Sequence, residues 1–174
     1  MIIAQLDGEA GFAEIFFDDV YVPDAQVLGG VGDGWRVAMT TAGSERGLTL
    51  RSPGRFLATA DRLLALAGES DDQTLQDAAV QARLDAEAYR LYAFQTAERI
   101  AAGGEVGAEA SLMKVFWSEL DLRMHETAME LLGPWAATGP WLDGFLFALA
   151  GPIYAGTNET QRTIIAERIL GLPR

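Results

Sequence analysis

Apolar residues recur every three or four positions between residues 109 and 132, and this periodicity constrains the fold more than any other feature of the sequence. On a helix such positions share one face, which can pack against a neighbouring element. The apolar residues at these spacings are Leu112, Val115, Phe116, Leu120, Met124 and Leu131. The segment is therefore predicted to form an amphipathic helix from Glu109 to Leu132.

Further helices are predicted along most of the chain, and together they indicate a mainly α fold. Hydrophobic residues make up 49% of the chain, and Ala and Leu are frequent whereas β-branched runs are few, a composition that favours helices. Short turns between the helices are typical of an antiparallel four-helix bundle. The expected helical ranges are 35–66, kinked or divided at Pro53 and Gly54, then 74–102, 141–149 and about 158–171.

A short β segment is expected before the bundle. Residues 11–22 combine β-branched and aromatic residues with partial alternation, and Pro23 closes the run. With only residues 1–10 before it, this strand has no obvious sheet to join, and a lone strand is marginal in water. We therefore expect residues 1–30 to be the end of a β domain with its linker, residues 31–174 to form the bundle, and the chain to be truncated at its N-terminus.

Charge and residue content argue against several classes of function. The chain has 13 basic and 25 acidic residues and a net charge of −12, which disfavours nucleic acid as a partner because phosphate binding needs clustered Lys and Arg. There is no cysteine and only one histidine, so no metal site is predicted. No apolar run approaches the ~20 residues of a membrane span, and no signal peptide is recognised. A cytoplasmic protein is expected.

Three other features are interpreted as structural. His125 is expected to be a structural or solvent-facing residue of its helix. The glycine-rich stretch 29–34 is predicted to be a turn, because it lacks the βαβ context and the Lys of a nucleotide-binding loop. The tryptophans are expected to pack in the core or an interface, with a substrate-lining role left open for the last two: Trp117, Trp135 and Trp141.

Two motifs lie near the two ends of the chain. The first is Gly-Phe-Ala-Glu-Ile-Phe-Phe-Asp-Asp-Val-Tyr-Val-Pro at 11–23, followed by Gly34-Trp35 and Glu45-Arg46. The second is Ile-Tyr-Ala-Gly-Thr-Asn-Glu-Thr-Gln-Arg at 153–162, followed by Ala-Glu-Arg-Ile-Leu-Gly at 166–171. In both, the chain resembles the acyl-CoA dehydrogenases. The first motif is similar to the family's junction between the middle β domain and the C-terminal helical domain, and the second to its active-site loop and last helix.

The resemblance implies a flavoprotein of lipid metabolism and fatty acid β-oxidation. Such an enzyme uses FAD to oxidise an acyl-CoA to a trans-2-enoyl-CoA, and it passes electrons to an electron-transfer flavoprotein or a similar acceptor. A Glu removes the α-proton while the β-hydrogen leaves as hydride to the flavin. The family assembles as dimers or tetramers, so a homo- or hetero-oligomer is expected. The chain alone is expected to be inactive, because it lacks the family's first helical domain and most of its β domain.

The resemblance also assigns the catalytic base. The family's usual base is the second residue of a Tyr-Glu-Gly-Thr motif, and that position is Ala155 here, which has no proton acceptor. A branch that resembles the isovaleryl- and long-chain dehydrogenases takes its base from the first bundle helix, in an acidic residue followed by Arg. Glu45 and Arg46 match that arrangement, so Glu45 is predicted to be the base, with a pKa raised by partial desolvation. The alternative is a surface glutamate paired with Arg46 or Arg51.

The second motif is assigned to substrate and flavin by the same resemblance. The backbone N–H of Ala155 is expected to donate to the thioester carbonyl, as an oxyanion-hole donor does. The remaining assignments are Arg46, Tyr154 and Gly156 for the substrate, and Thr157 and Glu159 for the flavin. The alternative reading is a loop with Thr157 or Asn158 as a helix N-cap, and the same residues can do both.

Two departures from the family affect its contacts with the FAD pyrophosphate. Its Arg-x-x-Phe-Gly motif has no counterpart in residues 60–70, where Arg55 and Arg62 are the best local substitutes. Its Gln-x-x-Gly-Gly motif, whose counterparts here are the cofactor-site residues Glu130 and Gly133, reads Glu-Leu-Leu-Gly-Pro. Glu130 places an anion near an anionic ligand, and Pro134 removes a backbone N–H.

Two explanations fit these departures. Either unlike subunits assemble and only some of their sites hold FAD, which we prefer, or FAD binds through altered contacts. The alternative function is therefore a non-catalytic helical subunit that completes the flavin site of a different dehydrogenase chain. A helical bundle without any link to flavin is the remaining possibility.

Overall fold

The computed structural model describes residues 1–47 and 52–173, and the side chains of residues 42–47 lie outside the described part. The chain divides into two compact units, Met1–Glu45 and Arg46–Arg174. Each unit is described by itself. The predicted base Glu45 and its neighbour Arg46 belong to helix α1, Gly34–Gly47, but their side chains are outside the described residues.

The first unit contains little regular β structure. Strand β1, Ile2–Ile3, pairs antiparallel with β2, Phe12–Ala13, and Ile2 lies opposite Ala13. The prediction of a strand over 11–22 is therefore wrong beyond Ala13. The part that does form a strand pairs with the short strand β1. A strand needs a neighbour to satisfy its backbone groups. Within the described residues only Ile2–Ile3 pairs with it, so residues 14–22 follow an irregular path.

Large apolar side chains of this irregular segment are exposed in the isolated chain. Phe17 is 80% exposed and Tyr21 is 83% exposed. A short 3-10 helix, Asp24–Gln26, follows. The predicted glycine-rich turn is then confirmed, because the Asp33 N–H donates to the Gly30 carbonyl at 3.0 Å and the Gly30 N–H donates to the Asp33 carboxylate at 3.1 Å.

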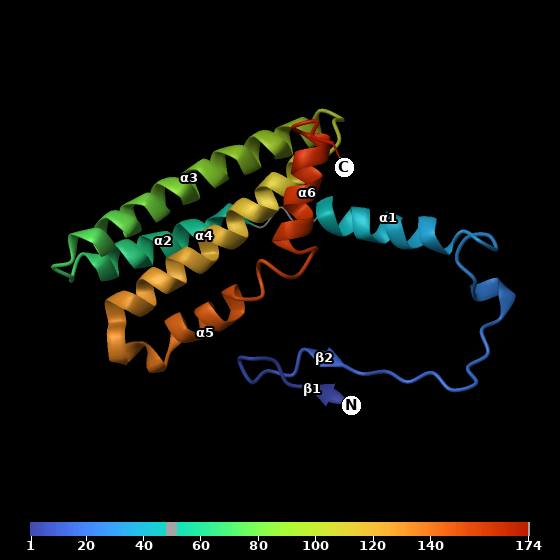
Figure 1. Cartoon of the computed structure of the whole chain (residues 1–174), viewed down its shortest axis with the longest axis horizontal. Helices are drawn as coiled ribbons and strands as arrows, with labels where there is room; N and C mark the ends of the chain where they lie inside the picture. The colour runs from blue at the N-terminus through green and yellow to red at the C-terminus, as the bar shows by residue number, and fades with distance from the viewer. Residues whose placement is uncertain (48–51, 174) are drawn as a thin grey trace. The chain divides into compact units, whose positions relative to one another are not determined.

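The second unit is the predicted antiparallel bundle. Its helices are α2 (Pro53–Ala67), α3 (Gln73–Ala101), α4 (Glu109–Leu132), α5 (Pro140–Ala148) and α6 (Asn158–Arg168), with a 3-10 turn, η2 (Gly133–Ala137), after α4. Figure 1 shows α2, α3 and α4 side by side with alternating direction, and α6 crossing the first part of α4. The mainly α fold with a short β segment is thus confirmed.

Local sequence explains where these helices begin. Pro53 opens α2, a position where its missing N–H costs nothing and where the sequence predicted a kink or a division. Asp72 caps α3 by accepting hydrogen bonds from the N–H groups of Thr74 and Leu75 at 2.8 and 3.3 Å. Thr157 caps α6 through a hydrogen bond from the Thr160 N–H at 3.3 Å. The alternative reading of Thr157 as an N-cap is confirmed.

The core of the bundle lies between α2, α3 and α4. Small residues of α3 allow the helices to approach, and aromatic rings fill the centre, with Phe56 against Tyr89 at 5.1 Å between ring centroids. Trp117 is fully buried and Trp141 packs against this core, whereas Trp135 is 83% exposed. The buried core residues are Phe56, Ala60, Leu63, Ala67, Ala79, Ala82, Ala86, Tyr89, Ala93, Met113, Trp117, Leu120, Met124 and Ala128.

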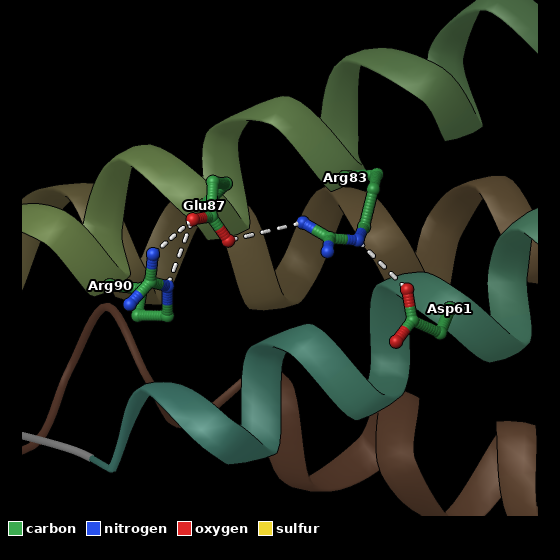
Figure 2. Close-up of polar contacts among 4 residues, drawn as sticks. All are labelled: Asp61, Arg83, Glu87 and Arg90. Carbon is green, nitrogen blue, oxygen red and sulfur yellow. Dashed lines mark hydrogen bonds and ion pairs between the residues drawn. The ribbon is translucent and has the colours of Figure 1, made fainter.

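A chain of partly exposed ion pairs joins α2 to α3 on the surface of the bundle. Arg83 Nε donates to the Asp61 carboxylate at 2.8 Å, and its guanidinium also meets Glu87 at 3.5 Å. Glu87 continues to Arg90 on the next turn. Figure 2 shows the four side chains in this order along the two helices. The Arg90 guanidinium, by its hydrogen bond, lowers the pKa of Glu87 below its ordinary value of 4.5.

No helix among the described residues is long and apolar enough to cross a membrane. Over the same residues no cluster of three or more His, Asp or Glu side chains is arranged to hold a metal ion.

Candidate functional site

The loop between α5 and α6 has an unusual backbone conformation. Ala155 has a φ of 55° and Gly156 a φ of 88°, so two successive residues adopt the left-handed region. This region disfavours residues with a Cβ, so Ala155 is held there by its surroundings. Hydrogen bonds fix both sides of the loop: the Tyr154 N–H donates to the Ala150 carbonyl at 3.1 Å, and the Asn158 N–H donates to the Pro152 carbonyl at 2.8 Å.

The backbone N–H groups of Ala155 and Gly156 are available for a ligand. In the part of the chain that the structure describes, neither donates a hydrogen bond to any acceptor. A half-buried N–H such as that of Ala155 is nearly always paired, and the N–H of Gly156 beside it is exposed, so the two successive donors are open to an electron-rich atom of a ligand or of water. The N-terminus of α6 starts directly after them and adds its positive dipole end.

Gln161 fixes the carbonyl side of the same loop. Its side-chain amide is 2% exposed and donates to the carbonyls of Ala155 and Gly156 at 3.1 and 3.4 Å. A Cβ at Gly156 would stand 2.6 Å from Gln161 Nε2, so this position needs a glycine both for its φ and for space. Sequence reasoning did not single out Gln161, which appeared only as a letter of the motif.

Thr157 and Glu159, which were assigned to flavin, lie at the start of α6. Glu159 is exposed in the first helical turn. Its own backbone N–H lowers the pKa of the Glu159 carboxylate most, followed by hydrogen bonding from Thr157. Glu159 is therefore an anion that stabilises the helix N-terminus, and Thr157 serves as N-cap. Any contact of either with flavin stays a prediction.

Tyr154 connects the loop to the core. Its ring lies 5.9 Å from the Trp117 ring, and the side chain is half-buried against the core cluster. Trp117 in turn packs on Phe56 at 6.2 Å. The loop that bears the free N–H groups is thus anchored on the bundle by an aromatic side chain.

A buried polar cluster lies beneath the loop, and the sequence did not predict it. Lys114 of α4 is 1% exposed, and its Nζ donates to Asn158 Oδ1 at 2.7 Å. Asn158 Nδ2 donates to Ser118 Oγ and to Glu119 Oε1, each at 3.2 Å. Arg162 pairs with Glu119 at the outer side of the contact. Burial lowers the pKa of Lys114 below its ordinary value, an effect that the nearby Glu159 and Glu119 partly oppose.

The two residues assigned to the pyrophosphate lie at the other end of α4. Glu130 is exposed in its last turn, and Gly133 caps the helix with a φ of 53°. Glu130 stands 16 positions after Lys114, which corresponds to roughly 24 Å along a helix. The structure therefore does not bring the 130–133 corner together with the 154–159 loop within one chain.

The two sets of contacts predicted for FAD differ in their chemistry. The free N–H groups of Ala155 and Gly156 suit an electron-rich atom of a flavin or a substrate. The corner at 130–134 does not suit a pyrophosphate, because Glu130 is an anion and Pro134 has no N–H to donate. One set of predicted contacts is thus compatible with FAD and the other is not.

The proposed substitutes for the missing phosphate contact already have partners inside the chain. Arg55 donates to the Asp121 carboxylate at 2.6 Å and lies over the Phe147 ring. Arg62 lies 5.4 Å from the centre of the Trp141 ring. Both side chains join α2 to the α4–α5 side of the bundle, and this structural role accounts for their positions.

His125 is buried and structural. Its Nδ1 lies 2.7 Å from the Asp121 carbonyl oxygen, and its ring packs edge-on against Trp141 at 5.6 Å. A Cβ at Gly144 would stand 2.3 Å from His125 Nε2, so α5 approaches the histidine closely. The structural interpretation of His125 is confirmed, and its solvent-facing alternative is wrong.

Comparison with known proteins identifies the family of the bundle. Residues 32–170 match the model of the acyl-CoA dehydrogenase C-terminal domain. The acyl-CoA dehydrogenase IpdE1 of Mycolicibacterium smegmatis is 38% identical over 182 residues, which cover 99% of this chain and 45% of that protein. The chain spans about half the length of such curated relatives.

Solved structures agree with this match. The Tcur3481-Tcur3483 steroid ACAD has a TM-score of 0.83 at 20% identity, covering 100% of this chain and 48% of that chain. The ChsE4-ChsE5 complex from Mycobacterium tuberculosis has a TM-score of 0.60 at 27% identity, covering 71% of this chain and 37% of that chain. With its bundle, its loop and its sequence in agreement, the chain belongs to the acyl-CoA dehydrogenase family, a family of flavoprotein oxidoreductases, and contains its C-terminal helical domain.

Proposed function

We propose that the chain is the C-terminal part of an FAD-dependent dehydrogenase that oxidises an acyl-CoA to a trans-2-enoyl-CoA. The observation that supports this most directly is the free backbone N–H of Ala155, held in a left-handed turn at the start of α6. Removal of a proton next to a thioester places negative charge on the carbonyl oxygen, and preorganised N–H donors stabilise such charge. We further propose residues 1–30 as the end of the β domain and 31–174 as the bundle domain.

Three groups of this chain act on the substrate. The Ala155 N–H donates to the thioester carbonyl oxygen and thereby acidifies the α-C–H. Glu45 takes the α-proton as general base, while Arg46, Tyr154 and Gly156 line the acyl-CoA site. The side chain of a general base must be within hydrogen-bond reach of the proton that it removes. Thr157 and Glu159 would lie beside FAD, which when bound would supply the acceptor for the β-hydrogen and its electron pair.

The alternative is a helical subunit that completes the flavin site of an unlike dehydrogenase chain. It is favoured by Glu130 and Pro134, which do not suit the pyrophosphate contact expected of a partner subunit. A structural relative, at 27% identity, is a complex of two named chains, ChsE4 and ChsE5. In this alternative the complex holds fewer flavins than subunits, and electron-transfer flavoprotein or a similar acceptor reoxidises them.

The test is to purify the complete gene product with the products of its genomic neighbours and to record its visible absorption spectrum. Addition of acyl-CoA thioesters should bleach the flavin bands. One flavin per chain supports a self-sufficient dehydrogenase, whereas flavin at half occupancy with an unlike partner supports the alternative. Absence of flavin from every such complex would overturn both.

The base is tested by Glu45→Gln in the same complex, with Glu69→Gln, an exposed glutamate after α2, as the control. Loss of a general base is expected to lower kcat by about 10²- to 10⁴-fold while flavin is retained. The control should turn over like the wild type. Unchanged turnover of Glu45→Gln would refute the assignment.

A further inference from the structure

Lys114 is the only lysine of the chain, and it is buried. A lysine is almost never fully buried unless its charge is paired or hydrogen-bonded. The side chain starts near the beginning of α4 and donates from Nζ to Asn158 Oδ1 at 2.7 Å, the short distance of a charge-assisted hydrogen bond. A buried charge costs free energy, so its position beneath the α5–α6 loop needs an explanation.

Asn158 links this charge to the loop. Among the residues that the structure describes, the Asn158 side chain forms hydrogen bonds with three residues of α4, namely Lys114, Ser118 and Glu119. Its backbone N–H donates to the Pro152 carbonyl at 2.8 Å and closes the loop on itself. One residue thus joins the rigid helix α4 to the segment 152–158, which bears the Ala155 N–H.

We propose that Lys114 is a positioning residue: through Asn158 it holds the 152–158 loop at the distance from α4 at which the Ala155 N–H meets the thioester oxygen. This inference rests on the proposed function for its consequence in catalysis, but its structural part concerns this chain alone. A charged donor inside a low-dielectric contact forms a stiffer link than a neutral pair. Gln161 fixes the carbonyls of Ala155 and Gly156 within the loop, whereas the hydrogen bonds of the Asn158 side chain tie the loop to α4.

The positioning role predicts that kcat and KM respond differently when Lys114 is replaced. The carbonyl oxygen gains most of its charge in the transition state, so a misplaced N–H donor weakens transition-state binding more than ground-state binding. Lys114→Met should therefore lower kcat by about ten- to a hundredfold and leave KM nearly unchanged. If Lys114 had only a structural role, Lys114→Met would lower the amount of folded enzyme, but the folded fraction would keep the wild-type kcat and KM.

The first experiment measures backbone amide exchange on the chain itself, so it does not depend on activity. In Lys114→Met the Asn158 N–H should exchange about tenfold faster, since local opening of the loop becomes easier, while amides in the centre of α3 keep their wild-type rates. Arg83→Met, which removes a partly exposed cation of α3, is the matched control and should leave the Asn158 amide unchanged. An unchanged Asn158 rate in Lys114→Met would overturn the proposal.

A milder variant covers the case in which Lys114→Met does not fold. Ser118→Ala removes one partner of the Asn158 amide without leaving a charge unpaired, and it should accelerate the same amide about two- to fivefold. Equal acceleration along the whole chain would show a general loss of stability and would also contradict the proposal.

The second experiment compares kcat and KM of wild type, Lys114→Met and Arg83→Met in the assembled dehydrogenase. A fall in kcat alone supports the positioning role, and a rise in KM alone contradicts it. If the wild-type assembly has neither flavin nor turnover, the proposed function fails, and the amide exchange still decides whether Lys114 fixes the loop.

Discussion

The α2–α3 surface and the α4–α6 contact both contain hydrogen-bonded charges, but they differ in exposure to solvent. In the first, Arg83 is 34% exposed and its partner Asp61 is 61% exposed. In the second, Lys114 is 1% exposed and Asn158 is 3% exposed. Water and salt screen the first set, whereas the second has exchanged water for protein partners.

Because of this difference in exposure, the two regions should contribute unequally to the stability of the fold. Exposed ion pairs contribute about 0–1 kcal/mol each, because solvent replaces a lost partner. Removing the hydrogen-bond acceptor of a buried charged group leaves that group unsatisfied, which costs about 1.5–3 kcal/mol. The four residues of Figure 2 are therefore replaceable individually, whereas Lys114 and Asn158 depend on each other.

The largest effect is expected for Asn158→Ala, which leaves Lys114 buried without its acceptor. The free energy of unfolding should fall by about 3 kcal/mol, because the buried Lys114 ammonium loses its hydrogen-bond acceptor. Urea denaturation of the purified chain measures it. The matched control is Gln81→Ala, which removes an exposed amide that donates to Asp85 at 2.8 Å and should cost no more than about 0.5 kcal/mol. Equal losses in the two variants would remove the contrast between the regions.

Much of the bundle could be predicted from the sequence, because helix periodicity and capping are local properties. The range Glu109–Leu132 matches α4, and the predicted 74–102 differs from α3 by one residue at each end. The strand over 11–22 was wrong because strand formation depends on a partner elsewhere in the chain. Alternation of apolar residues shows only that a segment could pair, not that a neighbour is present.

The candidate site was predictable only in part. The loop at 154–157 was found through its resemblance to a family, and its left-handed backbone could not be inferred from Ala155, a residue that seldom adopts it. Lys114 was missed because a lysine within an amphipathic pattern is normally solvent-facing. Only the packing of α6 on α4 brings Asn158 to it, across 44 positions of sequence. The assignment of Glu45 as base stays a prediction.

A second, smaller effect is expected for a pair of glycines, one in the loop beside α6 and one in the turn after α3. Gly156 beside α6 and Gly103 after α3 share a left-handed φ, 88° and 85°. Replacement by Ala should cost each about 1 kcal/mol for the backbone conformation. At Gly156 the added Cβ also meets Gln161 Nε2 at 2.6 Å, whereas nothing lies within 4 Å at Gly103. Gly156→Ala should therefore lose about 1 kcal/mol more in thermal or urea unfolding. A larger loss for Gly103→Ala would contradict this account of the loop.

The smallest expected effects concern the pH dependence of stability, which should differ between the two regions. The Arg90 guanidinium holds the pKa of Glu87 below its ordinary 4.5, so the stability that Glu87 contributes is fully present above pH 4.5 and is lost as the pH falls through the folded-state pKa. Glu87→Gln should therefore flatten the acid side of the stability profile, and 1 M salt should shrink the difference from wild type. Glu98→Gln, an exposed glutamate on the same helix, is the control.

Lys114 affects the alkaline side of the profile of stability against pH. Burial lowers its pKa below the ordinary 10.5, so between the folded-state pKa and pH 10.5 the unfolded chain binds the extra proton. Stability contributed at this site therefore rises with pH across that window, and Lys114→Met should remove the rise while leaving the acid side unchanged. Urea midpoints measured from acid to alkaline pH for the two variants test both signs together. An acid-side change in Lys114→Met, or an alkaline change in Glu87→Gln, would show that exposure does not separate the two regions.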